Sequence, residues 1–333
     1  MVQSMKNVNP IEGKEILVTG GLGFIGSNLS IKLLQMGARV TIIDSMLRGS
    51  GANMANVAPN ARRFSIRNRD VRNRSACEIV GGGQIVFHLA AQTNRLRALK
   101  DPKMDAEINY VGTVNVLESC RKNESFERLV FTSSRAVVGD PSKLPVDETY
   151  TPRPKDVYAV NKLAAERACL LYRDLYGMPV VILRPSNVYG PRGQIRYSEY
   201  GFINLFVGNV LMGKPIQVFG SGEHTRDPIF VDDLVDALIR LSVGKGVEGE
   251  TFFAGSGEEV SILQIARLVQ KVCGRGRIEF VRFPEPLARG EIRRFRVDYG
   301  KLAKCVRWHP RVRLSDGIRK TASYYARRLR QYA

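Results

Sequence analysis

Short apolar runs alternate with longer amphipathic segments along the first half of the chain. The runs are rich in Val, Ile and Leu and have the length of buried strands, whereas the segments between them have a helical period. The runs lie at residues 15–19, 38–43, 63–66, 84–89, 128–133 and 179–183. This alternation predicts parallel strands joined by crossover helices, which is a doubly wound α/β sheet.

The alternation ends after residue 184, where loops rich in Gly and Pro begin. Amphipathic stretches predict further helices at residues 201–212, 232–242, 261–273 and 315–329, with Ser261 as an N-cap. No internal repeat and no low-complexity linker separates the two halves. We therefore expect a second, smaller α/β lobe that is interwoven with the sheet.

A glycine-rich loop joins the first predicted strand to a predicted helix at 24–36, and it reads Thr-Gly-Gly-Leu-Gly-Phe-Ile-Gly over residues 19–26. Gly20 permits a tight turn, Gly23 lets the backbone approach a pyrophosphate, and Gly26 lets helix and strand pack closely. The helix N-terminus offers free N–H groups and a positive dipole end to phosphates. The loop therefore predicts a dinucleotide site.

The second predicted strand is followed by Asp44. A carboxylate at this place can accept hydrogen bonds from the adenosine ribose hydroxyls and repels a 2′-phosphate. Asp44 therefore favours NAD over NADP as the cofactor. Arg48, four residues further on, keeps NADP open as the alternative.

Tyr158 and Lys162 are four residues apart in a stretch with helical character, so they share one helix face. An ammonium beside a phenol stabilises the phenolate and lowers the tyrosine pKa, which makes the hydroxyl a usable general base. A surface tyrosine on a helix is the structural alternative, because this spacing alone is common. Its place after a dinucleotide loop favours the catalytic interpretation.

The composition is that of a soluble enzyme, with 44% hydrophobic residues available for a core. No apolar run reaches the ~20 residues of a membrane span, and the polar first ten residues do not resemble a signal peptide. The five cysteines are scattered without C-x-x-C spacing, which is typical of reduced cytosolic thiols. We expect a cytoplasmic protein, and the three dispersed histidines predict no metal site.

The formal net charge of +19 is high for an enzyme of small metabolites. It indicates either attraction to nucleic acid and anionic surfaces or a general enrichment in arginine. The charges are spread along the chain, and no basic stretch is interleaved with aromatic residues as in a stacking platform. We favour the second interpretation and expect no membrane binding and no specific nucleic-acid binding.

Further motifs follow the glycine loop in a fixed order. They are Asp70-Val71, the stretch 87–92 (Phe-His-Leu-Ala-Ala-Gln), Asn109 with Gly112-Thr113, Thr132-Ser133-Ser134, Tyr158 with Lys162, the stretch 184–191 (Arg-Pro-Ser-Asn-Val-Tyr-Gly-Pro), and Arg226-Asp227. Between residues 14 and 320 the chain thus resembles the extended short-chain dehydrogenase/reductase family, and within it the nucleotide-sugar epimerases and dehydratases of the UDP-glucose 4-epimerase type. The resemblance implies a Rossmann-type fold, bound NAD, a nucleotide-diphosphate sugar as substrate and a homodimer.

The resemblance also divides the chain. Residues 1–13 are an N-terminal extension, and residues 14–184 form the NAD-binding domain, to which residues 227–253 return. Residues 185–226 and 254–333 form the lobe that binds the nucleotide sugar.

Roles for individual residues follow from the same resemblance. Catalysis falls to Ser134, Tyr158 and Lys162, with Ser134 bonded to a sugar oxygen and Lys162 also bound to the nicotinamide ribose. The implied cofactor contacts are Gly20, Gly23, Phe24, Ile25, Gly26, Asp44, Asp70, Val71, Leu89, Ala90, Ala91, Asn109, Tyr158 and Lys162. The implied substrate contacts are Ser134, Arg95, Asn187, Arg226 and Arg289, with Asn187 and Arg226 on the diphosphate. A turn serine and a loop aspartate are the structural alternatives for Ser134 and Asp70.

Several positions depart from the family pattern. Dehydratases of this family carry Asp-Glu directly after the catalytic Ser or Thr, where this chain has Arg135 and Ala136. The acid that expels the C6 hydroxyl is therefore missing, which argues against a 4,6-dehydratase. Val138 stands where tyrosine is usual, and Arg289 is shifted by one place from the family's phosphate-loop arginine.

We therefore expect an NAD-dependent nucleotide-sugar epimerase that acts at C4 through a transient 4-keto sugar. A 2-epimerase, a decarboxylase and a 4-keto sugar reductase remain open within the family. A non-catalytic or nucleic-acid-binding protein on the same fold remains the alternative outside it, although the intact Ser134, Tyr158 and Lys162 argue against it.

Arg95, Arg97 and Arg135 are cations in excess of what the diphosphate requires, and they favour a sugar with a carboxylate, such as a uronate. The alternative is that they face solvent or pair with acids such as Asp101 and Glu107.

Overall fold

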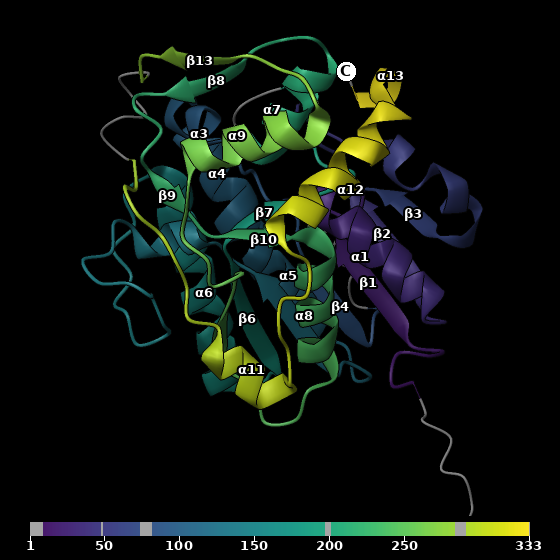
Figure 1. Ribbon diagram of the computed structural model, residues 1–333. Coiled ribbons are helices and arrows are strands. Elements are labelled where there is room, and N and C mark those ends of the chain that lie inside the picture. Colours follow the sequence, from purple (N-terminus) through teal and green to yellow (C-terminus); the bar gives the residue numbers. More distant parts are fainter. Residues whose placement is uncertain (1–8, 48, 74–81, 197–200, 284–290, 333) are drawn as a thin grey trace, which may run out of the picture.

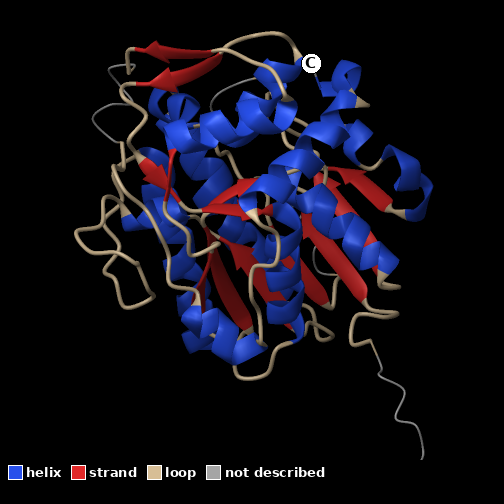
Figure 2. Cartoon of the chain, viewed as in Figure 1, coloured by secondary structure: helices blue, strands red, loops and turns tan. Residues whose placement is uncertain are grey.

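A seven-stranded sheet forms the centre of the protein in the computed structural model, which describes residues 9–47, 49–73, 82–196, 201–283 and 291–332 (Figure 2). In spatial order its strands are β11 (Thr251–Ala254), β6 (Val180–Pro185), β5 (Arg128–Thr132), β4 (Ile85–His88), β1 (Glu15–Thr19), β2 (Arg39–Asp44) and β3 (Ser65–Asn68). Every neighbouring pair is parallel. The six strands predicted from the sequence are confirmed, with bounds that differ by at most two residues.

The order of the strands reverses at the middle of the sheet. The chain runs from β1 outward through β2 and β3, and it then returns to place β4 on the other side of β1. The loops that follow β1 and β4 therefore leave the sheet in opposite directions and open a crevice at the carboxyl edge. This edge is where a doubly wound sheet binds its ligand.

Helices cover both faces of the sheet (Figure 1). On one face, α1 (Phe24–Gln35) packs against α8 (Val231–Val243). On the other face, α5 (Gly112–Arg121) packs against α6 (Val157–Tyr176). Two short helices, α3 (Arg95–Lys100) and α4 (Pro102–Ala106), precede α5, and a π-helical turn at Glu107–Val111 joins α4 to α5.

A smaller lobe packs around its own apolar core above the carboxyl edge of the sheet (Figure 1). It contains α7 (Phe202–Leu211), α9 (Ile262–Cys273) and α12 (Leu314–Ala326). Ser261 caps α9 as predicted, because its Oγ accepts the N–H of Gln264 at 3.1 Å and the Gln264 side chain accepts the N–H of Ser261 at 2.9 Å. The last predicted helix ends at Ala326, short of residue 329, and α13 (Leu329–Tyr332) follows as a separate turn.

Three pairs of short strands that the sequence did not predict complete the fold. They are β7 (Asn187–Tyr189) with β10 (Pro228–Phe230), β8 (Ile216–Phe219) with β13 (Ile278–Val281), and β9 (Thr225–Arg226) with β12 (Val260–Ser261). Strands of two to four residues carry too little periodicity to be recognised before their partners are known. The remaining helix, α11 (Gly300–Val306), lies after the last of them.

The end of the described chain returns to the nucleotide loop. The hydroxyl of Tyr332 donates to Asn56 Oδ1 at 2.5 Å, and Asn56 Nδ2 donates to the carbonyl of Leu22 at 2.9 Å. Asn56 belongs to a 3₁₀ turn (Met54–Asn56) that follows β2, and another (Ala58–Arg63) leads into β3. Two hydrogen bonds thus connect Tyr332 to the glycine-rich segment.

None of the helices in the described ranges combines the length and the apolar character that a membrane span requires.

Candidate active site

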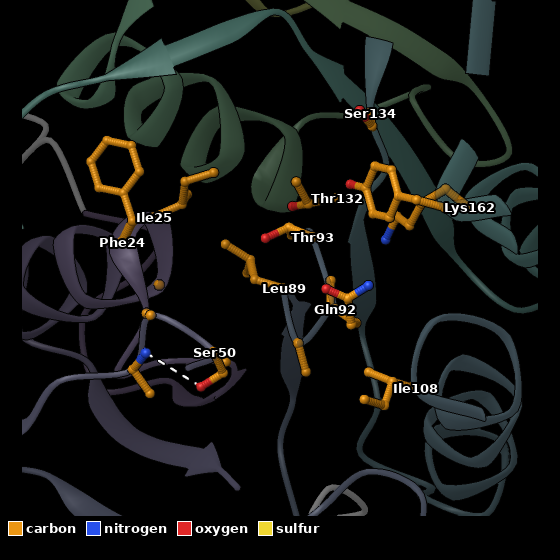
Figure 3. Close-up of a pocket in the computed structure, with 18 of the residues that line it drawn as sticks. Phe24, Ile25, Ser50, Leu89, Gln92, Thr93, Ile108, Thr132, Ser134 and Lys162 are labelled. Carbon is orange, nitrogen blue, oxygen red and sulfur yellow. Dashed lines mark hydrogen bonds between the residues drawn. The ribbon is translucent and has the colours of Figure 1, made fainter. Parts of the chain in front are cut away.

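A cavity of about 370 Å³ opens at the carboxyl edge of the sheet, where the strand order reverses. Figure 3 shows Phe24 and Ile25 on one side of it and Ser134 and Lys162 on the opposite side. Of the residues predicted to form the site, those that line the cavity are Gly20, Gly23, Phe24, Ile25, Gly26, Asp44, Asp70, Val71, Leu89, Ala90, Ala91, Arg95, Ser134, Tyr158, Lys162 and Asn187. The fold thus brings most of the predicted site together from segments far apart in the sequence.

Two predicted site residues, Asn109 and Arg226, do not line the cavity. Asn109 does not line the cavity, and its amide instead exchanges hydrogen bonds with the backbone N–H and carbonyl of Gln92 at 3.2 and 2.9 Å. Arg226 is buried outside the lining. Arg48 and Arg289 fall outside the described residues.

The glycine loop is confined by close contacts. A Cβ on Gly20, which has φ +70°, would meet the backbone N of Ala90 at 2.8 Å, and a Cβ on Gly26 would collide with the carbonyl oxygen of Gly20. At Gly23 a Cβ would meet only the Gly20 carbonyl, at 3.2 Å. Gly23 is the N-cap of α1 and offers no side-chain cap, so the first N–H groups of the helix remain available to an anion.

Asp44 both lines the cavity and holds the loops around it. Its carboxylate accepts the N–H of Leu22 at 3.0 Å and the N–H of Met46 at 2.9 Å. Burial raises the pKa of Asp44, while these two backbone hydrogen bonds act in the opposite direction. The carboxylate therefore stands at the end of β2 with its two oxygens fixed in position.

Asp70 follows β3 and is held by Arg72, whose guanidinium lies 2.8 Å from its carboxylate. Burial opposes ionisation, but the hydrogen bonds and charge of Arg72 outweigh it, so the pKa of Asp70 is lowered. Asp70 is therefore a fixed anion at the β2–β3 end of the cavity.

The candidate catalytic residues come from two elements that meet at the cavity wall. Ser134 lies just beyond β5, where its Oγ accepts the N–H of Ala136 at 3.1 Å, and its hydroxyl acts to lower the pKa of Tyr158. Tyr158 and Lys162 lie one turn apart on α6. Asp156 begins this helix, because its Oδ1 accepts the N–H of Ala159 at 2.8 Å. The cap therefore sets where the first turn of α6, and with it Tyr158, stands.

The i, i+4 spacing alone predicts a lowered pKa for Tyr158, but its pKa is raised. Burial raises it, while the hydrogen bond from Ser134 and the positive charge of Arg135 lower it. Burial also lowers the pKa of Lys162 to about 8, and its Nζ lies 4.1 Å from the centre of the Phe131 ring. The prediction left out desolvation, which dominates because the two side chains are only 9% and 1% exposed.

Arg95, which lines the cavity, is paired with two acids. Arg95 Nε lies 2.7 Å from Asp156 Oδ2, and Arg95 Nη1 lies 3.5 Å from Glu291 Oε2. These partners differ from the acids that the sequence offered as alternatives, Asp101 and Glu107. Glu291 also pairs with Arg226.

Protein groups take three of the five N–H donors of Arg226 in this arrangement. Its Nη1 donates to the carbonyls of Thr225 at 2.7 Å and Ile292 at 2.8 Å, and its Nη2 donates to Glu291. Burial and the charges of Arg135 and Arg95 hold its pKa well below the usual range. A role for Arg226 on the diphosphate stays a prediction.

Polar atoms in the cavity wall show where a ligand can bond. Thr132 Oγ1, Ser133 Oγ, Arg135 Nη1 and Asn187 Oδ1 are buried without a hydrogen-bond partner among the described residues, and all four residues line the cavity. Buried polar groups are rarely left unpaired in proteins. These atoms, together with the glycine cradle and Asp44, fit a dinucleotide and a polar substrate.

Sequence reasoning did not assign Thr132, Ser133, Gln92, Thr93 and Arg69 to the site, although all five line the cavity. Three of them belong to motifs that were recognised, so their neighbours in the sequence were the available signal. The side-chain directions of these three, Gln92, Thr132 and Ser133, depend on how β4 and β5 lie together, which a single sequence does not show.

The fold and the cavity define a dinucleotide-dependent enzyme with a tyrosine as its candidate base. Residues 16–255 match the sequence profile of the NAD dependent epimerase/dehydratase family. The chain belongs to this family, and its cofactor is NAD.

Individual relatives match along nearly the whole chain. The UDP-glucose 4-epimerase of Mycolicibacterium smegmatis is 35% identical over 313 residues, which cover 93% of this chain and 97% of that enzyme. An epimerase structure from Methanothermobacter thermautotrophicus has a TM-score of 0.90 and 28% identity, over 97% of this chain and 95% of that one. The UDP-glucuronic acid 4-epimerase of Bacillus cereus, solved with UDP-glucuronic acid and NAD, has a TM-score of 0.85 and 29% identity, over 94% and 99%.

Proposed function

We propose that the protein is an NAD-dependent nucleotide-sugar epimerase that inverts C4 of a nucleotide-diphosphate hexose through a transient 4-keto sugar. The observation that carries the proposal is the presence of Ser134, Tyr158 and Lys162 together in the wall of a cavity that the glycine loop also lines. The named relatives include UDP-glucose and UDP-glucuronic acid 4-epimerases.

In this proposal Tyr158 takes the proton of the C4 hydroxyl, and Ser134 hydrogen-bonds the same oxygen as it becomes a carbonyl. NAD supplies the acceptor for the C4 hydride and the positive charge of its oxidised ring. Lys162, one turn along α6, adds a fixed cation that favours the phenolate. When the 4-keto sugar has turned over in the cavity, the hydride would return to C4 on its other face, and Tyr158 gives the proton back to the C4 oxygen.

The residues that follow Ser134 oppose a dehydratase. Arg135 and Ala136 replace the acid pair, and the side chain of Arg135 lies over the Phe295 ring at 5.0 Å. No carboxylic acid therefore stands at these two positions to protonate a leaving hydroxyl.

A panel of UDP-, dTDP-, CDP- and GDP-hexoses, with the products resolved by NMR, tests the proposal. We expect the 4-epimer of at least one sugar to form without any added oxidant or reductant. Stoichiometric accumulation of NADH during turnover would show instead a dehydrogenase or a decarboxylase that leaves the hydride on the cofactor.

We also propose that the protein is a homodimer. Val160, Leu171 and Leu175 form a stripe along α6 and are 51%, 52% and 62% exposed. Tyr110 and Val111, just before α5, add 39% and 42% exposed apolar side chains. Several large apolar side chains exposed on helices that pack together indicate a partner surface.

Sedimentation velocity tests the dimer with the variant Leu175→Glu. We expect the native protein to sediment as a dimer and the variant as a monomer, because a charge at the stripe is desolvated on association. Phe280→Ser, at an equally exposed side chain on β13, is the control and should leave the dimer intact. A native protein that sediments as a monomer would rule the proposal out.

A further inference from the structure

Arg135 lies in the wall of the active-site cavity and has no ion-pair partner among the residues that the structure describes. Its guanidinium carbon lies 5.0 Å from the centre of the Phe295 ring, and its Nη1 is buried without a hydrogen-bond partner. Within the described parts of the chain, no carboxylate comes within 4.0 Å of its nitrogens. A half-buried guanidinium with a buried, unpaired N–H group is costly unless an anion joins it.

The acids nearby are already bound to other arginines. Asp156 pairs with Arg95, and Glu291 bridges Arg95 and Arg226. Asp227 acts on Arg135 only at longer range, and its carboxylate is taken up by the N–H groups of neighbouring backbone and by Ser256. The protein therefore supplies no anion to Arg135 from these elements.

The position of Arg135 decides which anion it can meet, and this step rests on the proposed function. Ser134 and Tyr158 mark the place of the C4 hydroxyl, and Arg135 is the next residue after Ser134. The diphosphate is attached at C1, across the hexose ring from C4. An anion beside C4 must therefore be carried by a substituent on C3 or C5.

We propose that Arg135 is a specificity-determining residue that binds a carboxylate carried by the sugar next to C4, so that the substrate class is an acidic nucleotide sugar. A guanidinium binds a carboxylate through two parallel N–H···O bonds, which explains an arginine here better than any other cation. The carboxylate is either that of a uronate, on C5, or that of an acidic ether on C3. Both present the same group to Arg135.

The state of the guanidinium agrees with this proposal. Burial and the charge of Arg95 lower the pKa of Arg135 to about 10. A bound carboxylate reverses both effects, because it replaces lost hydration and offsets the like charge. The side chain is thus set up to gain from an anion that the neutral hexose does not provide.

The test compares UDP-glucuronate, UDP-N-acetylmuramate and UDP-glucose with the NAD-loaded native protein and with Arg135→Gln and Arg135→Lys. The first two sugars carry the carboxylate on C5 and on the C3 substituent, and UDP-glucose is neutral. kcat/KM is measured for each, and dissociation constants are measured by calorimetry in a Tyr158→Phe background, where turnover does not interfere. Arg267→Gln, at an exposed position on α9, is the matched control.

We expect the native protein to favour one of the two carboxylated sugars over UDP-glucose by at least about tenfold in kcat/KM and in affinity, and Arg135→Gln to remove that preference. Arg135→Lys should keep part of this preference, since the positive charge remains while the two parallel N–H donors are lost. This variant also serves as a second test in case Arg135→Gln does not fold. Arg267→Gln should match the native protein. Which sugar is favoured identifies the position of the carboxylate.

A native preference for UDP-glucose, or a preference that Arg135→Gln leaves unchanged within about twofold, overturns the assignment of Arg135. Epimerisation of UDP-glucose in that case keeps the proposed function. If no sugar is epimerised, the proposed function fails, and the calorimetric comparison still decides whether Arg135 selects a carboxylate.

Discussion

Tyr158 is a buried phenol that has to ionise. Burial excludes water from the reacting atoms and strengthens every charge interaction around them, but it also raises the pKa of the hydroxyl. Ser134 and Arg135 act against that rise in the protein alone. The site is therefore built to need the positive charge of its cofactor before the tyrosine works as a base.

Replacing Tyr158 with Phe removes the base and leaves the shape of the cavity unchanged. We expect kcat to fall by about 10²–10⁴-fold with NAD affinity nearly intact, because only the proton acceptor is lost. Steady-state kinetics and fluorescence titration with NAD measure the two effects. Tyr176→Phe, on the exposed end of the same helix, is the control, and near-normal turnover of Tyr158→Phe would show that another group is the base.

Lys162 is stabilising for the reaction and destabilising for the fold. Its pKa falls from 10.5 to about 8 on burial, which means that the folded protein binds the proton less tightly than the unfolded chain. We expect Lys162→Met to raise the free energy of unfolding of the NAD-free protein at pH 7 by about 1–3 kcal/mol while abolishing turnover. Urea denaturation measures this difference.

The pH dependence of that difference has a defined sign. Between pH 8 and 10.5 the folded protein has released the Lys162 proton and the unfolded chain still holds it, so native stability rises with pH relative to the variant. The advantage of Lys162→Met should therefore shrink across this window. Lys103→Met, at a side chain that is 87% exposed, should show no such trend. A Lys162→Met protein less stable than the native one at pH 7 would contradict this account of burial.

At the scale of elements, substitutions at two glycines in the turn from β1 into α1 are expected to have different effects, one on stability and the other on cofactor binding. A Cβ on Gly26 collides with the Gly20 carbonyl, whereas a Cβ on Gly23 meets that oxygen at 3.2 Å and otherwise faces open space. We expect Gly26→Ala to lower the free energy of unfolding by about 1–3 kcal/mol, because the helix must shift away from the strand. Gly23→Ala should fold normally and lose NAD affinity, because its methyl group stands where the pyrophosphate approaches.

Thermal unfolding and NAD titration of the two variants separate these effects. Equal losses of stability in both would mean that the loop acts as one packing unit and not as a cradle.

At the scale of the whole molecule, the charge of +19 is distributed over many surface arginines. We expect weak binding to duplex and single-stranded nucleic acid that weakens steeply as salt rises, because a diffuse positive surface binds through counterion release. Fluorescence anisotropy with two unrelated sequences at low and at physiological salt measures it. Sequence-selective binding that persists at physiological salt would identify a nucleic-acid site.

The sheet, the main helices and part of the cavity lining were predictable because their signals are local. The glycine loop, the apolar strands and the Tyr158–Lys162 spacing each lie within a few consecutive residues. The pairing of Arg226 with Glu291 joins residues 65 positions apart, and it depends on how β9 lies against the segment at 291–297. The raised pKa of Tyr158 depends on burial, which exists only once both lobes are in place.

The contact between Tyr332 and Asn56 bears on when the enzyme first becomes competent. Asn56 holds the carbonyl of Leu22, and Tyr332 holds Asn56 from 276 residues further along the chain. At about 5–20 residues per second, synthesis of that stretch takes roughly 14–55 s. During this time the nascent nucleotide loop lacks one of its supports, so a ribosome-bound chain carries the parts of a cofactor site before the site is complete.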